Sequence, residues 1–105
     1  MYKVICLDLD GTLLDDKKEI SELNLKILEV LQLRGIEIVI ATGRGLTRIE
    51  QLTKNMKFPH VIIANNGAIA KSSSKDDILF YNTLDINIFN DIAKVSKNYN
   101  MLPYL

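Results

Sequence analysis

Residues Lys3–Leu14 read KVICLDLDGTLL, and this stretch decides the fold at the start of the chain. An apolar run ends at two carboxylates, Asp8 and Asp10, which Gly11 and Thr12 follow directly. Because side chains at i and i+2 of an extended strand point to the same side, we expect the two carboxylates to converge where the strand ends. Two close carboxylates repel each other unless a cation lies between them, and Mg²⁺ is a cation that prefers oxygen ligands. A carboxylate can also act as a nucleophile that forms an acyl phosphate, so the motif favours phosphoryl transfer at a metal; the alternative is a plain Asp-Gly turn.

The composition is that of a globular protein of one domain. The 105 residues are 48% hydrophobic and 25% charged, and 13 basic residues balance 13 acidic ones. This balance gives no overall field that favours nucleic acid or an anionic membrane, and no apolar run is long enough to cross a bilayer. The N-terminus leads directly into the expected strand without a secretory signal pattern, so we expect a cytoplasmic location. The single cysteine, Cys6, lies inside the apolar run and is predicted to be buried.

Hydrophobic periodicity predicts strands that alternate with helices. In chain order we expect a strand over 2–9, a helix over 21–34, a strand over 36–41, a helix over 46–56, a strand over 61–64, two short strands over 68–70 and 78–81 around a polar loop over 71–77, and a helix over 85–99. Ser21 is the expected N-cap of the first helix and Gly35 its C-terminal stop. The order indicates parallel strands with right-handed crossovers, and the continuous apolarity of the first strand indicates cover on both faces.

Each expected helix carries an apolar stripe that is predicted to face the core. The stripes are Leu23, Ile27, Leu28 and Leu31 in the first helix, Leu46, Ile49, Leu52 and Met56 in the second, and Ile88, Ile92, Val95 and Tyr99 in the third. Pro103 and Tyr104 lie in a short tail that could begin another strand.

Polar, glycine-containing turns follow all three expected parallel strands. They are the Asp8/Asp10 turn, Thr42–Arg44 and Asn65–Gly67. In open α/β sheets ligands bind beyond the carboxyl ends of the strands, so three such turns at one edge predict a site there. His60 follows a proline in an expected loop, which does not favour a catalytic role.

Three segments together resemble the haloacid dehalogenase superfamily, and more narrowly its Cof-like branch of phosphatases with a large α/β cap. They are DLDGTLL at Asp8–Leu14, IVIATGR at Ile38–Arg44 and NNGA at Asn65–Ala68, and they occur in the family's order. The resemblance implies an α/β fold in which residues 1–67 form the N-terminal part of a Rossmann-like catalytic core, with a parallel three-stranded β-α-β-α-β unit. Residues 68–105 would then start the cap, as a β-hairpin and a helix, so that the fold is incomplete.

The resemblance also implies roles for the first two turns. Asp8 would be the nucleophile that carries the aspartyl-phosphate, and Asp10 would protonate the leaving oxygen and later deprotonate the attacking water. The Asp8 carboxylate and the Asp10 backbone carbonyl would hold Mg²⁺. Backbone N–H groups at Leu9 and Asp10, the Thr42 hydroxyl and the Gly43 N–H would hold the phosphoryl oxygens.

Arg44 and Asn66 are candidate substrate contacts by the same resemblance. Each assignment has a simpler alternative. Thr42 could cap the following helix, Arg44 could pair with a surface carboxylate, and Asn65–Gly67 are good turn residues in any protein. The pair at Lys17 and Lys18 is expected to face solvent.

Two family features are not visible in this sequence: a lysine beyond the third strand, and an acidic motif at the end of a later strand that completes the metal site. Lys71, Lys75 and Asp76–Asp77 belong to the expected hairpin loop, so their context does not match. In the family the first strand lies inside the sheet, so here its open edge is expected to favour self-association or docking of a partner.

The leading hypothesis is therefore a Mg²⁺-dependent phosphatase of small phosphorylated metabolites, most of all sugar phosphates. The alternative is a catalytically incomplete fragment or remnant that acts, if at all, by binding a partner chain. A signalling receiver is set aside, because a receiver carries its phosphoryl-accepting aspartate after the third strand, where this chain has Asn65 and Asn66.

Overall fold

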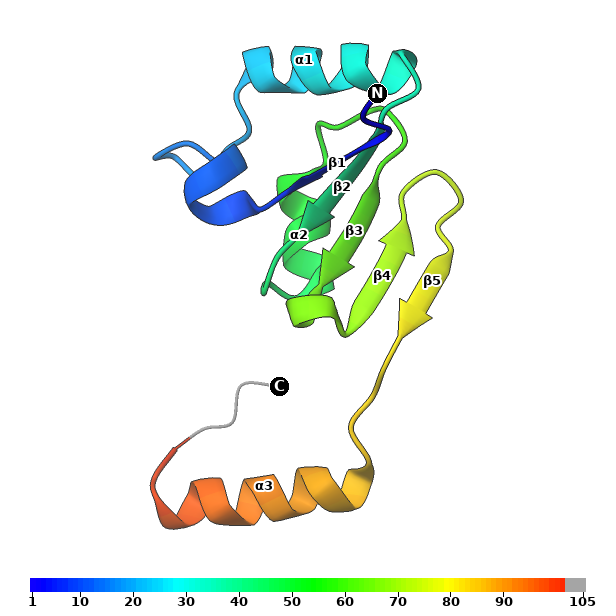
Figure 1. Ribbon diagram of the computed structural model, residues 1–105. Coiled ribbons are helices and arrows are strands. Elements are labelled where there is room, and N and C mark those ends of the chain that lie inside the picture. Colours follow the sequence, from blue (N-terminus) through cyan, green and yellow to red (C-terminus); the bar gives the residue numbers. More distant parts are fainter. Residues whose placement is uncertain (102–105) are drawn as a thin grey trace.

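The computed structural model describes residues 1–101 and contains one five-stranded sheet (Figure 1). The strands lie side by side in chain order: β1 Val4–Leu7, β2 Glu37–Ala41, β3 Val61–Ala64, β4 Ile69–Ser72 and β5 Ile78–Tyr81. The pairs β1–β2 and β2–β3 are parallel, while β3–β4 and β4–β5 are antiparallel. The predicted α/β class with a parallel three-stranded unit is confirmed.

Three helices connect or follow the strands: α1 Glu22–Leu33, α2 Leu46–Leu52 and α3 Ile86–Asn98. The Ser21 hydroxyl accepts a hydrogen bond from the Asn24 N–H at 3.2 Å, so the predicted cap of α1 is confirmed. Gly35 follows this helix with a φ of +81°, a conformation that glycine adopts without the steric cost of a Cβ. The second helix is shorter than predicted, because Thr53 leaves the helical conformation with φ −93° and ψ 6°.

One face of the sheet carries the core. Side chains alternate between the two faces of each strand, and on the covered face Ile38, Ile40 and Ile62 are almost fully buried. They share one apolar cluster with Leu28 of α1 and Ile49 of α2. Figure 1 shows α2 behind the sheet and α1 across the end of the sheet where β2 begins.

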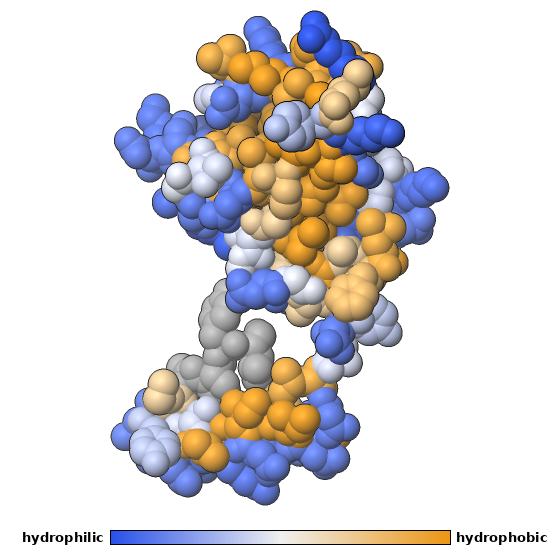
Figure 2. Space-filling model, viewed as in Figure 1, coloured by the Kyte–Doolittle hydropathy of each residue, from blue (hydrophilic) through white to orange (hydrophobic). Residues whose placement is uncertain are grey.

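The opposite face of the sheet is open to solvent. Val4 is 50% exposed, Cys6 is exposed, and both lie at the β1 edge. Their register partners continue the face through Val39 to Val61, and Figure 2 shows the apolar surface that results. The predicted burial of Cys6 is therefore wrong: its apolar strand indicated two covered faces, but within residues 1–101 helices pack on one face only.

The apolar stripes of two helices are also more exposed than predicted. In α1, Leu28 is buried, but Leu23 and Ile27 are 67% and 47% exposed. Helix α3 stands apart from the sheet in Figure 1, and its predicted core residues lie at the surface. These are Ile88, Ile92, Val95 and Tyr99. Amphipathicity indicates that a face can be buried, but not which element covers it.

The hairpin after β3 continues the same sheet. Lys71 was expected in the hairpin loop, but it lies within β4, opposite Ile62 of β3. The sheet thus continues without a break to Tyr81, and the division of the chain at residues 67/68 stays a prediction. Over residues 1–101 no helix combines the length and the apolarity that a membrane span requires. The expected strand at Pro103 and Tyr104 lies outside the described residues.

Candidate active site

The first motif forms a tight turn directly after β1. The strand ends at Leu7, and the Leu13 and Leu14 N–H groups donate to the carbonyl oxygens of Asp8 and Leu9, at 3.3 and 2.9 Å. Leu9 and Leu13 are buried in the apolar core and so anchor this turn to it.

The motif carboxylates sit on this turn and not on an extended strand. Gly11 has a φ of +75°, and Asp10 departs from helical geometry with a ψ of 123°. The expected position of both carboxylates on an extended strand is therefore wrong, because β1 ends at Leu7 and the chain turns directly afterwards; the convergence of Asp8 and Asp10 stays a prediction. Both still belong to the carboxyl edge of the sheet, as predicted.

Backbone hydrogen bonds connect the turn after β2 to the turn after β3. The Asn66 N–H donates to the Thr42 carbonyl at 3.3 Å, and the Asn65 N–H donates to the Arg44 carbonyl at 2.9 Å. A Cβ at Gly43 would lie 2.7 Å from Oδ1 of Asn66, so only glycine allows this close approach. The predicted meeting of these two turns at one edge is confirmed.

Arg44 joins the second turn to the first. Its Nε donates to Oδ2 of Asp10 at 2.6 Å and its Nη2 to Oδ1 at 2.7 Å, a two-point contact between guanidinium and carboxylate. The Lys18 ammonium adds a third bond to Oδ1, at 3.3 Å. The hydrogen bond from Arg44 is the main reason that the pKa of Asp10 falls to about 2, so this carboxyl is ionised at neutral pH. Arg44 does pair with a carboxylate, but with one inside the candidate site.

Lys18 is the site residue that the sequence did not reveal. It was expected to face solvent, yet it contacts Asp10 across the turn that follows the first motif. A basic pair in a polar turn is common at any protein surface. The informative signal is only its position, within ten residues of the acidic motif.

The Asp8 carboxylate is exposed, and its Oδ1 accepts the Leu9 N–H at 2.8 Å. This amide was expected to hold a phosphoryl oxygen, and here it orients the expected nucleophile. The Thr42 hydroxyl accepts the Arg44 N–H at 3.3 Å, whereas the N-cap of helix α2 is Gly45, where no side chain caps the helix. The alternative that Thr42 caps the helix is therefore wrong, and its hydroxyl hydrogen remains a donor for another acceptor.

The carboxyl edge of the sheet offers some, but not all, of the oxygen ligands that a hard cation such as Mg²⁺ takes. Within residues 1–101 no group of three or more histidine, cysteine, aspartate or glutamate side chains could hold a metal ion. The Asp8 carboxylate and the Asp10 backbone carbonyl are oxygen ligands of the kind that Mg²⁺ takes alongside several waters. The Asp10 side chain is occupied by Arg44 and Lys18.

The family model for haloacid dehalogenase-like hydrolases matches residues 5–105. The chain belongs to this family. It is 33% identical over 99 residues to the 5-amino-6-(5-phospho-D-ribitylamino)uracil phosphatase YitU of Bacillus subtilis, and 38% identical over 66 residues to the phosphatase of the same name, YcsE, from that organism. The first match covers 93% of this chain and 37% of the relative, the second 63% and 26%.

Solved structures agree with this assignment. A haloacid dehalogenase-like hydrolase from Bacteroides thetaiotaomicron superposes with a TM-score of 0.83 at 32% identity, and covers 95% of this chain and 39% of its own. One from B. subtilis gives a TM-score of 0.84 at 31% identity, over 93% and 34%. The resemblance to Cof-like phosphatases is confirmed. The chain spans between 26% and 39% of the length of these four relatives.

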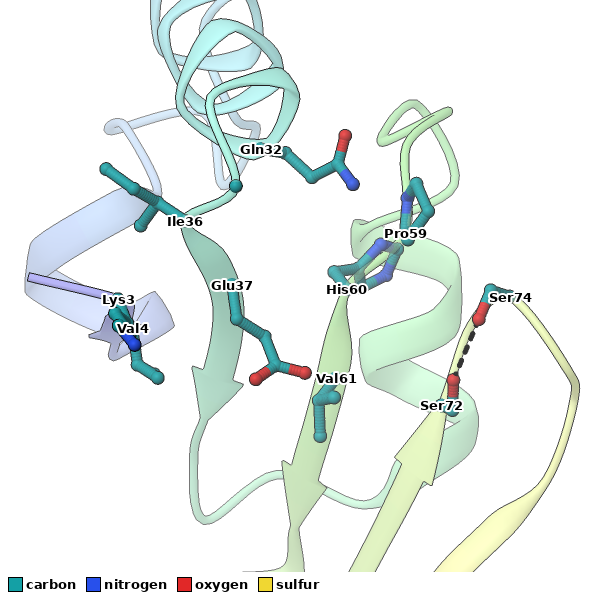
Figure 3. Close-up of a pocket in the computed structure, with 11 residues that line it drawn as sticks. Lys3, Val4, Gln32, Ile36, Glu37, Pro59, His60, Val61, Ser72 and Ser74 are labelled. Carbon is teal, nitrogen blue, oxygen red and sulfur yellow. Dashed lines mark hydrogen bonds between the residues drawn. The ribbon is translucent and has the colours of Figure 1, made fainter.

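A cavity elsewhere in this haloacid dehalogenase-like chain contains none of the motif residues. Its volume is about 560 Å³, and it lies on the open face at the end of the sheet where β2 and β3 begin (Figure 3). His60 at its border is buried; its Nδ1 lies 2.9 Å from the Phe58 carbonyl, and burial lowers its pKa. A neutral histidine held in this way fits a structural role, so the carboxyl edge remains the candidate active site.

Proposed function

We propose that this chain carries the nucleophile half of a Mg²⁺-dependent phosphatase that acts on small phosphorylated metabolites, with sugar phosphates as the leading class. The observation that carries the proposal is the exposed Asp8 carboxylate at an edge where Arg44 and Lys18 supply positive charge. The two B. subtilis relatives are named for a substrate with a phosphorylated ribityl group, which supports this chemical class.

In the proposed reaction Asp8 attacks phosphorus, the ester P–O bond breaks, and an aspartyl-phosphate forms. The leaving oxygen takes a proton from Asp10, and Asp10 later takes a proton from the water that hydrolyses the aspartyl-phosphate. The contacts from Arg44 and Lys18 keep Asp10 ionised and lower its pKa, which makes this carboxylate a weak base and leaves it without a proton to donate in the present arrangement. Both steps therefore require the two cations to move from Asp10 to the incoming phosphoryl group, and for the acid step Asp10 must first take up a proton from solvent.

The phosphoryl oxygens would be held by the Thr42 hydroxyl and by the backbone N–H groups of Gly43 and Asp10, with Arg44 and Asn66 beside them. Preorganised donors contribute most of the stabilisation in phosphoryl transfer. A bound Mg²⁺ at the Asp8 carboxylate and the Asp10 carbonyl would neutralise charge on the transferred group.

The test is phosphate release from p-nitrophenyl phosphate by the purified chain, with and without Mg²⁺, beside an Asp8→Asn variant. Mg²⁺-dependent turnover that the variant lacks would support the proposal. A folded chain without turnover would contradict phosphatase activity of this chain by itself and favour the alternative of a catalytically incomplete remnant.

The open face of the sheet favours a second candidate, in which the chain acts by binding a partner chain. Val4 and Cys6 lie exposed on β1, whose outer edge pairs with no strand among residues 1–101, and such edges favour association with another strand. Sedimentation velocity over a hundredfold range of concentration tests self-association: a constant monomer mass would contradict it. A cytoplasmic location stays a prediction.

A further inference from the structure

A second cavity, of about 500 Å³, adjoins the candidate active site. One wall is the turn at 17–20, and the other is the outer side of α2 with the residues that follow it. Lys18 belongs to this wall, and its ammonium contacts Asp10, so the cavity and the active site share one side chain.

The turn that carries Lys18 is held in a fixed shape. Oδ1 of Asp15 accepts the N–H groups of Lys17 and Glu19, at 2.9 and 3.0 Å, and the Lys18 N–H donates to the Asp15 carbonyl at 3.0 Å. Leu14 and Ile20 form a bridge that closes the base of the turn. Lys18 has a φ of +61°, a left-handed conformation that is uncommon for a lysine. The backbone of the turn is therefore fixed, and both lysine side chains leave it from defined positions beside the cavity.

The charge around this cavity is strongly biased. Four cationic side chains and one carboxylate line it: Lys17, Lys18, Arg48, Lys54 and Glu19. In the described part of the chain, residues 1–101, no carboxylate forms an ion pair with Lys17, Arg48 or Lys54. Among the side chains that the structure describes, Arg48 donates to the neutral amide of Gln51, at 3.2 Å. Although the chain as a whole has no net charge, these cations without a carboxylate partner produce a local positive field that attracts anions.

We propose that this cavity binds a second phosphate group on the substrate, one that is not transferred. Buried Ile20 and half-buried Leu52 form an apolar base of the cavity, and the cationic side chains line its sides. The apolar base suits the carbon skeleton of a small metabolite, and the cations suit its terminal phosphate. Because Lys18 lines the cavity and also contacts Asp10, a reacting phosphate at Asp8 and a second phosphate in the cavity would share this cation. The proposal rests on the proposed phosphatase function and narrows its substrate class to metabolites with two phosphate groups.

The experiment compares binding of fructose 1,6-bisphosphate and fructose 6-phosphate by isothermal titration calorimetry, with Mg²⁺ present and with Asp8→Asn in every protein to prevent hydrolysis. The test protein adds Arg48→Gln and Lys54→Gln. The control adds Lys26→Gln and Lys94→Gln, which remove the same charge from exposed positions outside the cavity. Circular dichroism checks that all proteins fold alike.

We expect the bisphosphate to bind at least tenfold more tightly than the monophosphate in the Asp8→Asn protein. The test substitutions should remove that advantage, and leave the monophosphate affinity within twofold, while the control substitutions leave both affinities within twofold. Equal affinities for the two probes at the outset, no binding of either, or an equal loss in the control would overturn the proposal.

A failure of the proposed function is distinguishable from a failure of the second site. Absence of p-nitrophenyl phosphate turnover with a retained, cavity-dependent preference for the bisphosphate would leave the anion site standing. Turnover without that preference would leave the phosphatase standing and remove the second phosphate site. A single Lys17→Gln variant, which changes an exposed turn residue outside the sheet and helices, gives an independent check and should weaken bisphosphate binding alone.

Discussion

Gly43→Ala is expected to disturb the candidate active site through a single steric contact. The added Cβ would lie 2.7 Å from Oδ1 and 3.4 Å from Cγ of Asn66, whereas ordinary contacts of this kind begin near 3.4 Å. The Asn66 side chain must therefore move by roughly 0.7 Å or rotate, while its backbone stays tied to the Thr42 carbonyl. Overpacking of this kind costs about 1–3 kcal/mol, and the short asparagine side chain favours the lower end.

Gly45→Ala is the matched control. A Cβ at Gly45 would lie 3.6 Å from Oδ1 of Asn65, an ordinary contact, so no neighbour has to move. Both substitutions reduce the entropy of the unfolded chain by a similar amount, and alanine is a poorer N-cap than glycine at Gly45. These two effects oppose each other at Gly45, so we expect a change within about 0.5 kcal/mol there.

Urea unfolding followed by circular dichroism measures both variants, and a double-substitution cycle isolates the contact. In an Asn66→Gly background the clashing atoms are gone, so Gly43→Ala should cost at least about 1 kcal/mol less than in the starting protein. If Gly43→Ala is equally destabilising in both backgrounds, the contact with Asn66 is not the cause and the reasoning is refuted. Where turnover is measurable, the displaced Asn66 should also lower it, because a misplacement of about 1 Å can cost roughly 100-fold in rate.

Three further predictions concern other parts of the chain. Arg44→Gln should raise the pKa of Asp10 from about 2 toward 3.8, as followed by NMR titration. The stability that the ion pair contributes is present above the unfolded pKa of 3.8 and is lost as the pH falls toward 2. An unchanged pKa in the variant would contradict the ion pair between Arg44 and Asp10. Ser21→Ala should destabilise the protein by about 1 kcal/mol in urea unfolding, because it removes the acceptor for the Asn24 N–H, and a cost near zero would argue against the cap. Cys6 should react with Ellman's reagent in the folded protein as fast as a free thiol, whereas a strongly protected thiol would mean that the open face is covered in solution.

The parallel unit could be predicted because its signals are local. The run from Val4 to Leu7, the cap at Ser21 and the glycine stop at Gly35 each specify one feature of the backbone, and the structure has all three. The carboxyl edge follows from them, since parallel strands of one sheet place their final turns together. This is why three short motifs, far apart in sequence, indicated one site.

Burial could not be predicted with the same success, because it depends on which elements are present to cover a surface. Val4–Leu7 is as apolar as a strand that is covered on both faces, yet Cys6 is exposed because the described helices pack on the other face. The apolar stripe of α3 likewise indicates an amphipathic helix, but this helix stands apart from the sheet and its Ile88 is 54% exposed. Sequence shows that a surface can be buried, but the partner surface decides whether it is.

The side-chain contacts of the candidate site could not be predicted from the sequence. Gly43 was expected to offer its N–H to a phosphoryl oxygen, but its close approach to Asn66 became visible only in the structure. Likewise, nothing in a sequence says that Arg44 and Lys18 reach the same carboxylate, that of Asp10. Long cationic side chains find their partners only after the turns are placed, so ion pairs across turns are the least predictable part of such a site.

The arrangement of these contacts bears on how much of the site this chain organises by itself. Among the described residues, backbone hydrogen bonds shape the turns: the Leu13 N–H donates within the first turn, and the Asn65 and Asn66 N–H groups join the third turn to the second. None of them involves the open face or the unpaired edge of β1. Covering that face would therefore add stability to the sheet without being required to shape the turns. It follows that these turns can take their shape before any further element packs against β1.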